Sequence, residues 1–204
     1  MRSLVNTIFL VTSFCLLASG CAINGSKFSE REKISTISIN SRIQMPQNPL
    51  VGPSLQLRTA EENSLKVDSQ RGESAQFKAI LDQQRIDFRN MLFDRMSNHI
   101  GVLNSKLVKS ANAKSAELHL AVLTYGLVKG YWLTTKPYIT VKADLYFDGK
   151  IIWTKEIDAH GFSDTLSVPM GEALKPSNLN SLFLSGVDYV SKDLESSLTI
   201  FLTQ

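Results

Sequence analysis

The chain has 204 residues, 43% of them hydrophobic, with 22 lysines and arginines against 19 aspartates and glutamates. This near balance of charge is too weak to indicate a nucleic-acid-binding protein, and two cysteines are too few for a fold held by disulfides. A chain of this length and hydrophobic content can build one domain with its own core.

Residues 1–20 have the layout of a bacterial export signal. Arg2 is followed by an apolar run over residues 4–17, which ends in the small residues Ala18, Ser19 and Gly20. The run is shorter than the roughly 20 apolar residues that a membrane-spanning helix needs. We therefore predict a signal peptide that is removed from the chain.

Cys21 follows this signal directly, and three chemical states are open to its thiol. A disulfide needs a partner, but Cys15 lies inside the segment that is removed. A free thiol would be prone to oxidation outside the cytoplasm. The third state is a thiol that carries lipid. The alternative signal is an ordinary secretory one, cut near Gly20 or Ala22, which leaves Cys21 without a role.

The sequence Leu17-Ala18-Ser19-Gly20-Cys21 resembles the lipobox of bacterial lipoproteins, which runs apolar, small, small, cysteine. Leu17 lies one position further out than the leucine of the family, and Ala18 takes its place. The resemblance implies diacylglycerol on the Cys21 sulfur, cleavage before Cys21 and, in many Gram-negative bacteria, acylation of its amine. Several acyl chains anchor a protein far more firmly than one. Because Ala22 follows rather than an aspartate, similarity to enteric sorting rules implies the outer membrane.

Residues 21–33 are polar and contain glycine and serine, so we predict that the lipidated cysteine and a tether occupy this range. A single domain is predicted over residues 34–204. Alternating apolar and polar residues predict a first strand over residues 34–45. Prolines and a glycine end it, and residues 46–73 are predicted to form a long loop that is either functional or mobile.

Ser74 is predicted to cap a helix that runs to about His99, because apolar residues recur there at helical spacing. Ile86 and Phe93 fall nearly opposite the apolar stripe, so they are either buried on a second side or exposed on a surface. His99 is expected at the C-terminal end of this helix, where the helix dipole favours a cation.

Two strands are predicted next. Residues 116–128 are apolar on both alternating sets, which favours a central strand covered on both faces. Residues 137–147 alternate cleanly, which favours a strand with one face in water.

Asp148-Gly149 marks a hairpin into a third strand. A two-residue loop would pair Phe147 with Lys150 and leave Trp153 opposite Asp144. We predict instead a three-residue loop over residues 148–150, which pairs Phe147 with Ile151 and Leu145 with Trp153, because this register places apolar side chains opposite one another.

Residues 159–177 contain several glycines and prolines and are predicted to form a second long loop. After it, an apolar stripe over residues 179–202 predicts an amphipathic helix. The order β-α-β-β-β-α indicates an α+β fold in which a largely antiparallel four-stranded sheet carries two amphipathic helices on one face.

The sequence DAHGFSD is a candidate for catalysis or metal binding, because Asp158 and His160 share a strand face and Ser163 and Asp164 follow. No third ligand and no nucleophile elbow accompany them, and a strand that enters a turn explains the same residues. Phosphate loops, paired-cysteine motifs and dinucleotide fingerprints are absent from the sequence. We predict no catalytic residues, no metal site and no cofactor other than covalent lipid on Cys21.

Tyr131, Trp132 and Leu133 lie in the connection between two predicted strands, flanked by Lys129 and Lys136. Aromatic side chains in such a loop can contact a protein partner or lipid headgroups. The alternative is that Trp132 folds back over the end of the core. We therefore select Tyr131, Trp132 and Leu133 as candidate partner-contact residues.

The order of the predicted elements, with the segments AELHLAVLTYGL and VKADLYFDGKIIWTKEI, resembles a group of bacterial envelope lipoproteins over most of residues 34–204. The group comprises the YajG-like lipoproteins, the periplasmic domain of the penicillin-binding-protein activator lipoproteins and the curli-secretion lipoprotein domain. The resemblance implies an accessory role without catalysis, in which the domain binds or regulates a machine of the cell envelope.

The predicted function is therefore that of an outer-membrane lipoprotein that faces the periplasm and acts as a binding or assembly module. Its expected contacts are the membrane, through the lipid on Cys21, and an envelope protein complex or further copies of itself; nucleic acid is not expected. The alternative is an exported enzyme or small-ligand-binding protein that uses the loops at residues 46–73 and 159–177.

Overall fold

The computed structural model describes residues 31, 33–52, 56–58, 64–66, 72–107, 114–160 and 163–203. Cys21, the signal over residues 1–20 and most of the tether over residues 21–33 lie outside the described residues, so what we predict for them stays a prediction. The same holds for parts of the loop over residues 46–73.

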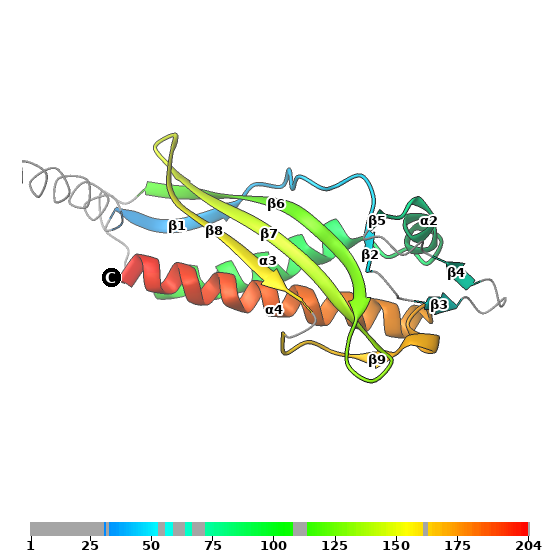
Figure 1. The fold of residues 1–204 in the computed structure, drawn as a ribbon. Helices are drawn as coiled ribbons and strands as arrows, with labels where there is room; N and C mark the ends of the chain where they lie inside the picture. The colour runs from blue at the N-terminus through cyan, green and yellow to red at the C-terminus, as the bar shows by residue number, and fades with distance from the viewer. Residues whose placement is uncertain are drawn as a thin grey trace, which may run out of the picture.

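The centre of the fold is a long antiparallel pair formed by β6 (Lys114–Lys129) and β7 (Thr134–Phe147) (Figure 1). β8 (Lys150–Ala159) pairs with β7 in the antiparallel sense. The short β9 (Val168–Pro169) pairs with the first residues of β7. This half of the sheet follows the predicted hairpin order.

The other side of β6 is lined by parallel strands. β1 (Ile34–Ile39) pairs with its first residues and β2 (Leu50–Val51) with its last. β5 (Gly72–Glu73) adds to β2, and β3 (Gln56–Arg58) and β4 (Ser64–Lys66) form a separate small pair.

The α+β class is confirmed, but the predicted largely antiparallel four-stranded sheet is wrong, because the sheet is mixed and has seven strands among the described residues. Parallel neighbours need a crossover connection, and helices between β2 and β6 supply one. These helices return the chain to the end at which β1 began. β6 therefore starts beside β1 and runs in the same direction.

Two helices replace the single helix predicted to begin after Ser74. The cap is confirmed, since Ser74 Oγ accepts a hydrogen bond from Phe77 N at 3.1 Å, but α2 (Ala75–Gln83) ends early and α3 (Phe88–Lys106) follows. Arg85 adopts a left-handed conformation with φ 57°. The N–H of Arg85 donates to Asp82 O at 3.1 Å and that of Ile86 to Leu81 O at 2.9 Å. This pattern is a Schellman motif, which ends a helix.

The same motif explains Ile86, which stood apart from the apolar stripe. A Schellman motif brings the residue after the left-handed one onto the last turn of the helix, and Ile86 is a half-buried neighbour of the core. Asp87 then caps α3 by accepting from Asn90 N at 3.0 Å. His99 consequently lies inside α3 rather than at a helix end, which corrects the prediction.

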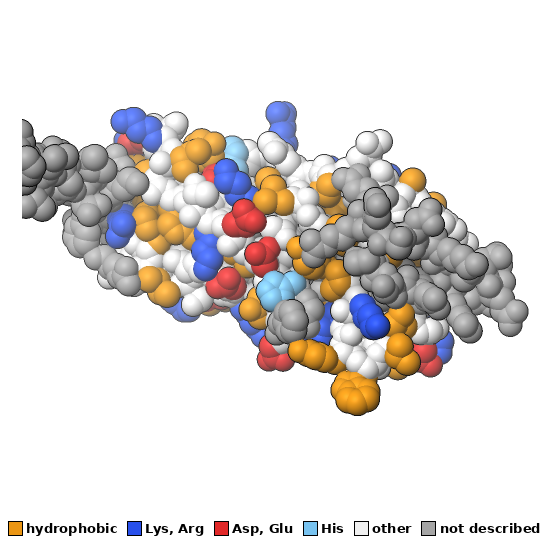
Figure 2. Space-filling view, viewed as in Figure 1, with side chains coloured by type: hydrophobic (Ala, Val, Ile, Leu, Met, Phe, Trp, Pro, Cys, Tyr) orange, Lys and Arg blue, Asp and Glu red, His pale blue; other side chains and the backbone are white. Residues whose placement is uncertain are grey.

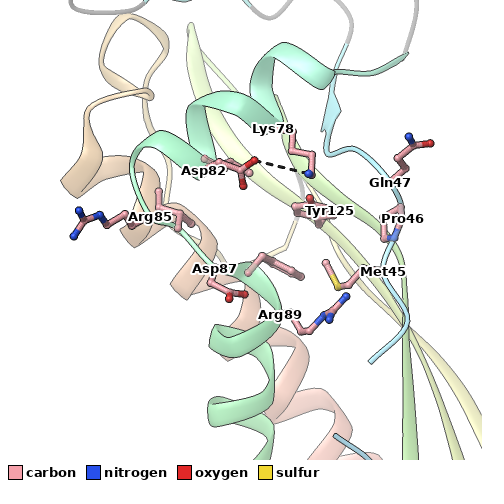
Figure 3. Close-up of a pocket in the computed structure, with 12 residues that line it drawn as sticks. Met45, Pro46, Gln47, Lys78, Asp82, Arg85, Asp87, Arg89 and Tyr125 are labelled. Atoms are coloured by element: carbon pink, nitrogen blue, oxygen red, sulfur yellow. Dashed lines mark ion pairs between the residues drawn. The ribbon is translucent and has the colours of Figure 1, made fainter. Parts of the chain in front are cut away.

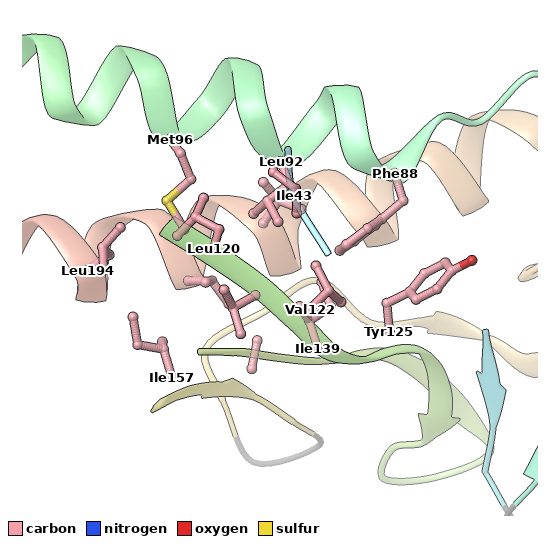
Figure 4. Packing of buried hydrophobic residues seen from close by; sticks show 14 of the residues in the cluster. Ile43, Phe88, Leu92, Met96, Leu120, Val122, Tyr125, Ile139, Ile157 and Leu194 are labelled. Atoms are coloured by element: carbon pink, nitrogen blue, oxygen red, sulfur yellow. The ribbon is translucent and has the colours of Figure 1, made fainter. Parts of the chain in front are cut away.

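α4 (Pro176–Thr203) follows a short 3₁₀ turn, η1 (Met170–Glu172). It packs against β7, β8 and α3, while α3 packs against β1, so the two long helices cover one face of the sheet as predicted (Figure 1). Figure 4 shows apolar side chains from α3, α4 and the sheet meeting in the layer between them. The largest fully buried side chains include Phe77, Phe183, Leu92, Met96 and Leu120.

The β7–β8 hairpin combines both registers that we considered. Phe147 lies opposite Lys150 across a two-residue turn, so the predicted three-residue loop and the Phe147–Ile151 pair are wrong. Leu145 nevertheless lies opposite Trp153, as predicted. Both are possible because the register shifts by one residue between them, which leaves Ile152 as an extra, buried residue in β8.

A second bulge corrects the prediction that β6 is covered on both faces. Alternation buries Leu118, Leu120 and Val122, and the register then shifts between Val122 and Thr124. Leu123 is the extra residue and is 46% exposed, whereas Tyr125 and Leu127 return to the core. The run of apolar residues thus reflects a change of phase rather than two buried faces.

The free edge of β1 is closed by a side chain from α3. Asn104 Oδ1 accepts from Ile37 N and Asn104 Nδ2 donates to Ile37 O, both at 2.8 Å. The amide therefore makes the pair of hydrogen bonds that a neighbouring strand would make.

We predict that Gly126→Ala destabilises the fold, because a Cβ at this position would lie 1.9 Å from Leu50 O of β2. The free energy of unfolding, measured by urea denaturation, should fall by about 1–3 kcal/mol.

Gly101→Ala is the matched control, since no atom lies within 4 Å of a Cβ at that α3 position. It should raise the free energy of unfolding by up to about 1 kcal/mol through helix propensity. Equal stability of Gly126→Ala and the unmodified protein would show that β2 does not press against β6.

Candidate functional site

The connection between β6 and β7 forms a tight turn from Tyr131 to Thr134. Thr134 N donates to Tyr131 O at 3.0 Å, and Gly130 N donates to Thr134 O at 2.8 Å. A Cβ on Gly130 would lie 2.6 Å from Thr134 Oγ1, so a larger residue there would require the Thr134 side chain to move. We call Tyr131, Trp132 and Leu133 the tip.

The backbone of the tip is strained. Trp132 and Leu133 have φ values of 51° and 58°, which is the left-handed region at both central positions of a type I′ turn. Asparagine and glycine favour these positions, whereas each bulky residue there costs about 1–2 kcal/mol. The other end of β7 makes the comparable turn with Asp148 and Gly149, residues that suit it.

The tip side chains face solvent. Tyr131 is 63% exposed, Trp132 95% and Leu133 68%, so the interpretation that Trp132 folds back over the core is wrong. Figure 2 shows hydrophobic side chains gathered at this end of the molecule, below β9. Backbone strain that yields no packing within the domain points to a role outside it.

A segment of the second predicted loop braces the tip. Pro169 of β9 lies opposite Thr134, and Met170 N donates to Leu133 O at 2.9 Å. Lys136 donates from Nζ to Ser163 O at 2.9 Å, which turns it toward the loop that follows β8. Lys129 remains an exposed cation beside the tip.

The tip lies far from the start of β1. Ile34 of β1 lies beside Lys114 at the start of β6, and β6 has 16 residues. At roughly 3.3 Å per residue the strand places the tip about 50 Å from Ile34. Figure 1 shows the β6–β7 connection and the start of β1 near opposite ends of the molecule.

In the cluster around Asp158 and His160, Ser163 hydrogen-bonds to the backbone of His160. Ser163 Oγ accepts from His160 N at 2.9 Å, and Ser163 N donates to His160 O at 2.8 Å. Asp158 is exposed and lies opposite Thr140. Within the described parts of the chain, no group of three histidine, cysteine, aspartate or glutamate residues could hold a metal ion.

An open cavity of about 670 Å³ lies where α2 meets α3 and was not predicted. Its apolar lining includes Met45, Phe88 and Tyr125 (Figure 3). Its charged lining comprises Lys78, Asp82, Arg85, Asp87 and Arg89, with Lys78 Nζ 3.8 Å from Asp82 Oδ2. Figure 3 shows the Arg85 side chain directed away from Met45 and Tyr125. The off-stripe position of Ile86 was the sequence signal for the turn that forms this cavity.

The carboxylates with shifted pKa values lie outside the tip and the cavity. A hydrogen bond from His99 lowers the pKa of Glu195 despite partial burial, and Lys106 adds to this effect. His119 likewise lowers the pKa of Glu117. Burial acts to raise the pKa of Asp144, but hydrogen bonds from Thr154 and Lys142 outweigh it and lower the pKa. Glu195 thereby joins α4 to α3, and Asp144 joins β7 to β8.

Among the described residues, none of the helices is both long enough and apolar enough to span a bilayer.

Comparison with known proteins gives weak matches. No family model matches the chain, and no curated protein does. A solved DUF330 protein of Xanthomonas campestris is 11% identical, with 81% of this chain and 84% of that chain covered and a TM-score of 0.46. A candidate lipoprotein of Caulobacter crescentus is 10% identical, with 56% and 83% covered and a TM-score of 0.39. At such TM-scores these likenesses support no argument about this chain.

We predict that replacing Trp132-Leu133 by Asn-Gly stabilises the domain, because these residues suit the left-handed turn. The free energy of unfolding should rise by about 1–2 kcal/mol in urea denaturation.

The control is the double variant Trp132→Ala and Leu133→Ala, which removes the same exposed side chains but keeps residues with a Cβ at both positions. Its free energy of unfolding should stay near that of the unmodified protein. An Asn-Gly variant no more stable than this control would show that the turn carries no strain.

Proposed function

We propose that this protein is a lipoprotein of the bacterial outer membrane, anchored through lipid on Cys21, and that its domain faces the periplasm as a non-enzymatic binding or assembly module. The tip is its contact with another protein of the envelope or with further copies of itself. The observation that carries the proposal is Trp132, which is 95% exposed on a turn whose backbone favours other residues.

The chemistry of the tip supports a protein contact. Tryptophan and tyrosine supply much of the binding energy at protein interfaces, where they enter pockets on the partner. The tip is narrow, projects from a sheet that holds it, and is braced by Met170. A partner with a small apolar pocket would remove Trp132 from water without any rearrangement of the domain.

The N-terminal sequence supports the anchor. Small residues precede Cys21 and Ala22 follows it, which suits cleavage before a lipid-bearing cysteine and transfer to the outer membrane. A polar tether then links the anchor to Ile34, where β1 begins. This arrangement keeps the domain close to the membrane surface.

Binding of a small ligand at the α2–α3 cavity is the second candidate function. The cavity combines aromatic surface from Phe88 and Tyr125 with charged groups, which is the composition of many ligand sites. We favour the tip because its exposed apolar surface and its backbone strain have no role within the domain. The residues that line the cavity, in contrast, also form the turn between α2 and α3 or pack in the core.

We predict that Cys21→Ser accumulates as a precursor that keeps residues 1–20 and carries no acyl groups. Mass spectrometry of the purified protein and fractionation of the envelope measure this directly. Ser26→Ala, inside the tether, is the control and should leave processing unchanged. A Cys21→Ser product cleaved like the unmodified protein would refute the lipid anchor.

We predict that a photoreactive residue at Tyr131 captures one dominant envelope protein when intact cells are illuminated. Trp132→Ala in the same chain should reduce this adduct at least tenfold, because loss of a central tryptophan contact costs about 2 kcal/mol or more. A photoreactive residue at the exposed Glu156 of β8 is the matched control and should not capture that protein. Absence of any adduct from Tyr131 would refute the tip as a contact.

A further inference from the structure

Several chain segments meet at the end of the molecule opposite the tip. β1 begins there beside β6, and Lys114 Nζ lies 2.7 Å from Asp148 Oδ2 of the β7–β8 turn. α3 and α4 both end there, and Lys106 Nζ lies 3.2 Å from Glu195 Oε1. Arg31 stacks over the ring of Phe201 at 4.2 Å. We call this surface, formed by Arg31, Lys33, residues 105–107, Lys114, residues 148–151 and residues 200–203, the entry end.

The entry end carries an excess of positive charge. Lys106 and Lys114 belong to it, and its only described carboxylate is Asp148. Asp148 and Glu195 are each engaged by a lysine, and Glu117, three residues along β6 from Lys114, is engaged by His119 and Asn40.

Further cations add to these lysines. Lys33 and Lys150 are exposed. Within the described residues of the entry end, Arg31, Lys33, Lys106, Lys114 and Lys150 stand against one carboxylate, Asp148, so the surface is cationic.

Apolar side chains lie among these cations. Ile151 of the hairpin is 49% exposed and Ile200 of α4 is 52% exposed. The rings of Trp153 and Phe201 lie 6.2 Å apart and are only half-buried. Figure 2 shows basic, hydrophobic and a smaller number of acidic side chains interspersed at the end of the molecule that carries the β7–β8 hairpin and the C-terminus. Lysine ammonium groups can interact with the lipid headgroups of a membrane surface, and exposed isoleucine side chains with the outer part of its acyl chains.

We infer that the entry end docks onto the anionic phospholipid surface of the membrane in which Cys21 is anchored. This inference rests on the proposed function, because the anchor keeps that end near lipid. Arg31 lies ten positions after Cys21, and at roughly 3.3 Å for each position the chain between them reaches at most about 35 Å. Each lysine near an anionic surface then contributes attraction that decays within a Debye length of about 8 Å.

Docking fixes the orientation of the domain. The sheet then stands away from the membrane, and the tip faces the periplasm about 50 Å from the lipid surface, since β6 has 16 residues of roughly 3.3 Å. Without docking, the domain would turn freely on its tether and the tip would reach the membrane as readily as a partner. The two surfaces therefore have complementary roles, one toward lipid and one toward protein.

The test uses the purified lipoprotein in vesicles of phosphatidylcholine, with or without phosphatidylglycerol. A photoreactive residue is placed at Ser105, an exposed position beside Lys106, or at Leu133 of the tip. We expect lipid adducts from position 105 in vesicles that contain phosphatidylglycerol, fewer in neutral vesicles or at high salt, and none from position 133. Mass spectrometry counts the adducts.

Charge reversal sharpens the test. Lys33→Glu with Lys150→Glu should lower the adducts from position 105 at least tenfold, because each lysine near an anionic surface is worth roughly fivefold in affinity. Lys129→Glu with Lys175→Glu, near the tip and the start of α4, changes the net charge equally and should have no effect.

Three outcomes would overturn the inference: lipid adducts from position 133 instead of 105, adducts from neither position, or equal adducts in neutral vesicles. The same mass spectra report the acyl groups on Cys21 independently. An unmodified Cys21 would refute the proposed anchor, whereas an acylated chain without adducts at position 105 would refute only the docking of the entry end.

Discussion

The hydrogen-bonded ladder between β6 and β7 runs from Glu117 opposite Tyr146 to Lys129 opposite Thr135, and the other elements take their positions from it. β1 and β2 line its far side, β8 and β9 its near side, and the two long helices cover one of its faces. A one-residue slip of register would move every side chain of a strand to the wrong face of the sheet. The two strands are therefore held in one alignment, and this alignment also fixes the distance between the tip and the entry end.

The two turns at the ends of β7 show how differently the same geometry is used. At one end Asp148 and Gly149 accept positive φ values at little cost, and the turn only joins two strands. At the other end Trp132 and Leu133 adopt the same region at a cost in stability and place their side chains in water. One end of β7 therefore carries a strained, exposed aromatic turn and the other an unstrained turn that suits its residues.

Much of the fold follows from the sequence. Helical stripes identified α4 and most of α3, alternation identified β7, and Ser74 marked the start of α2. The errors have local causes. Bulges at Leu123 and Ile152 change the phase of alternation without changing residue type, and an arginine at position 85 ends α2 where a glycine would have signalled the end.

The tip and the cavity differ in how much of each could be predicted from the sequence. Residue type alone selected Tyr131, Trp132 and Leu133, but exposure depends on which way a turn folds, and sequence could not decide that. The cavity between α2 and α3 depends on the unpredicted helix break. The sequence also did not predict that β1 runs parallel to β6. This direction follows from a crossover connection through two helices and not from any pattern within the strand.

The amide of Asn104 has a consequence for how copies of this fold can add to one another. By satisfying the backbone of Ile37, it occupies a pair of groups that an added strand would need at the edge of β1, while β8 at the opposite margin pairs with β7 alone among the described strands. A strand from another copy would have to displace this amide to pair with β1 at Ile37, so the addition of a strand is disfavoured there.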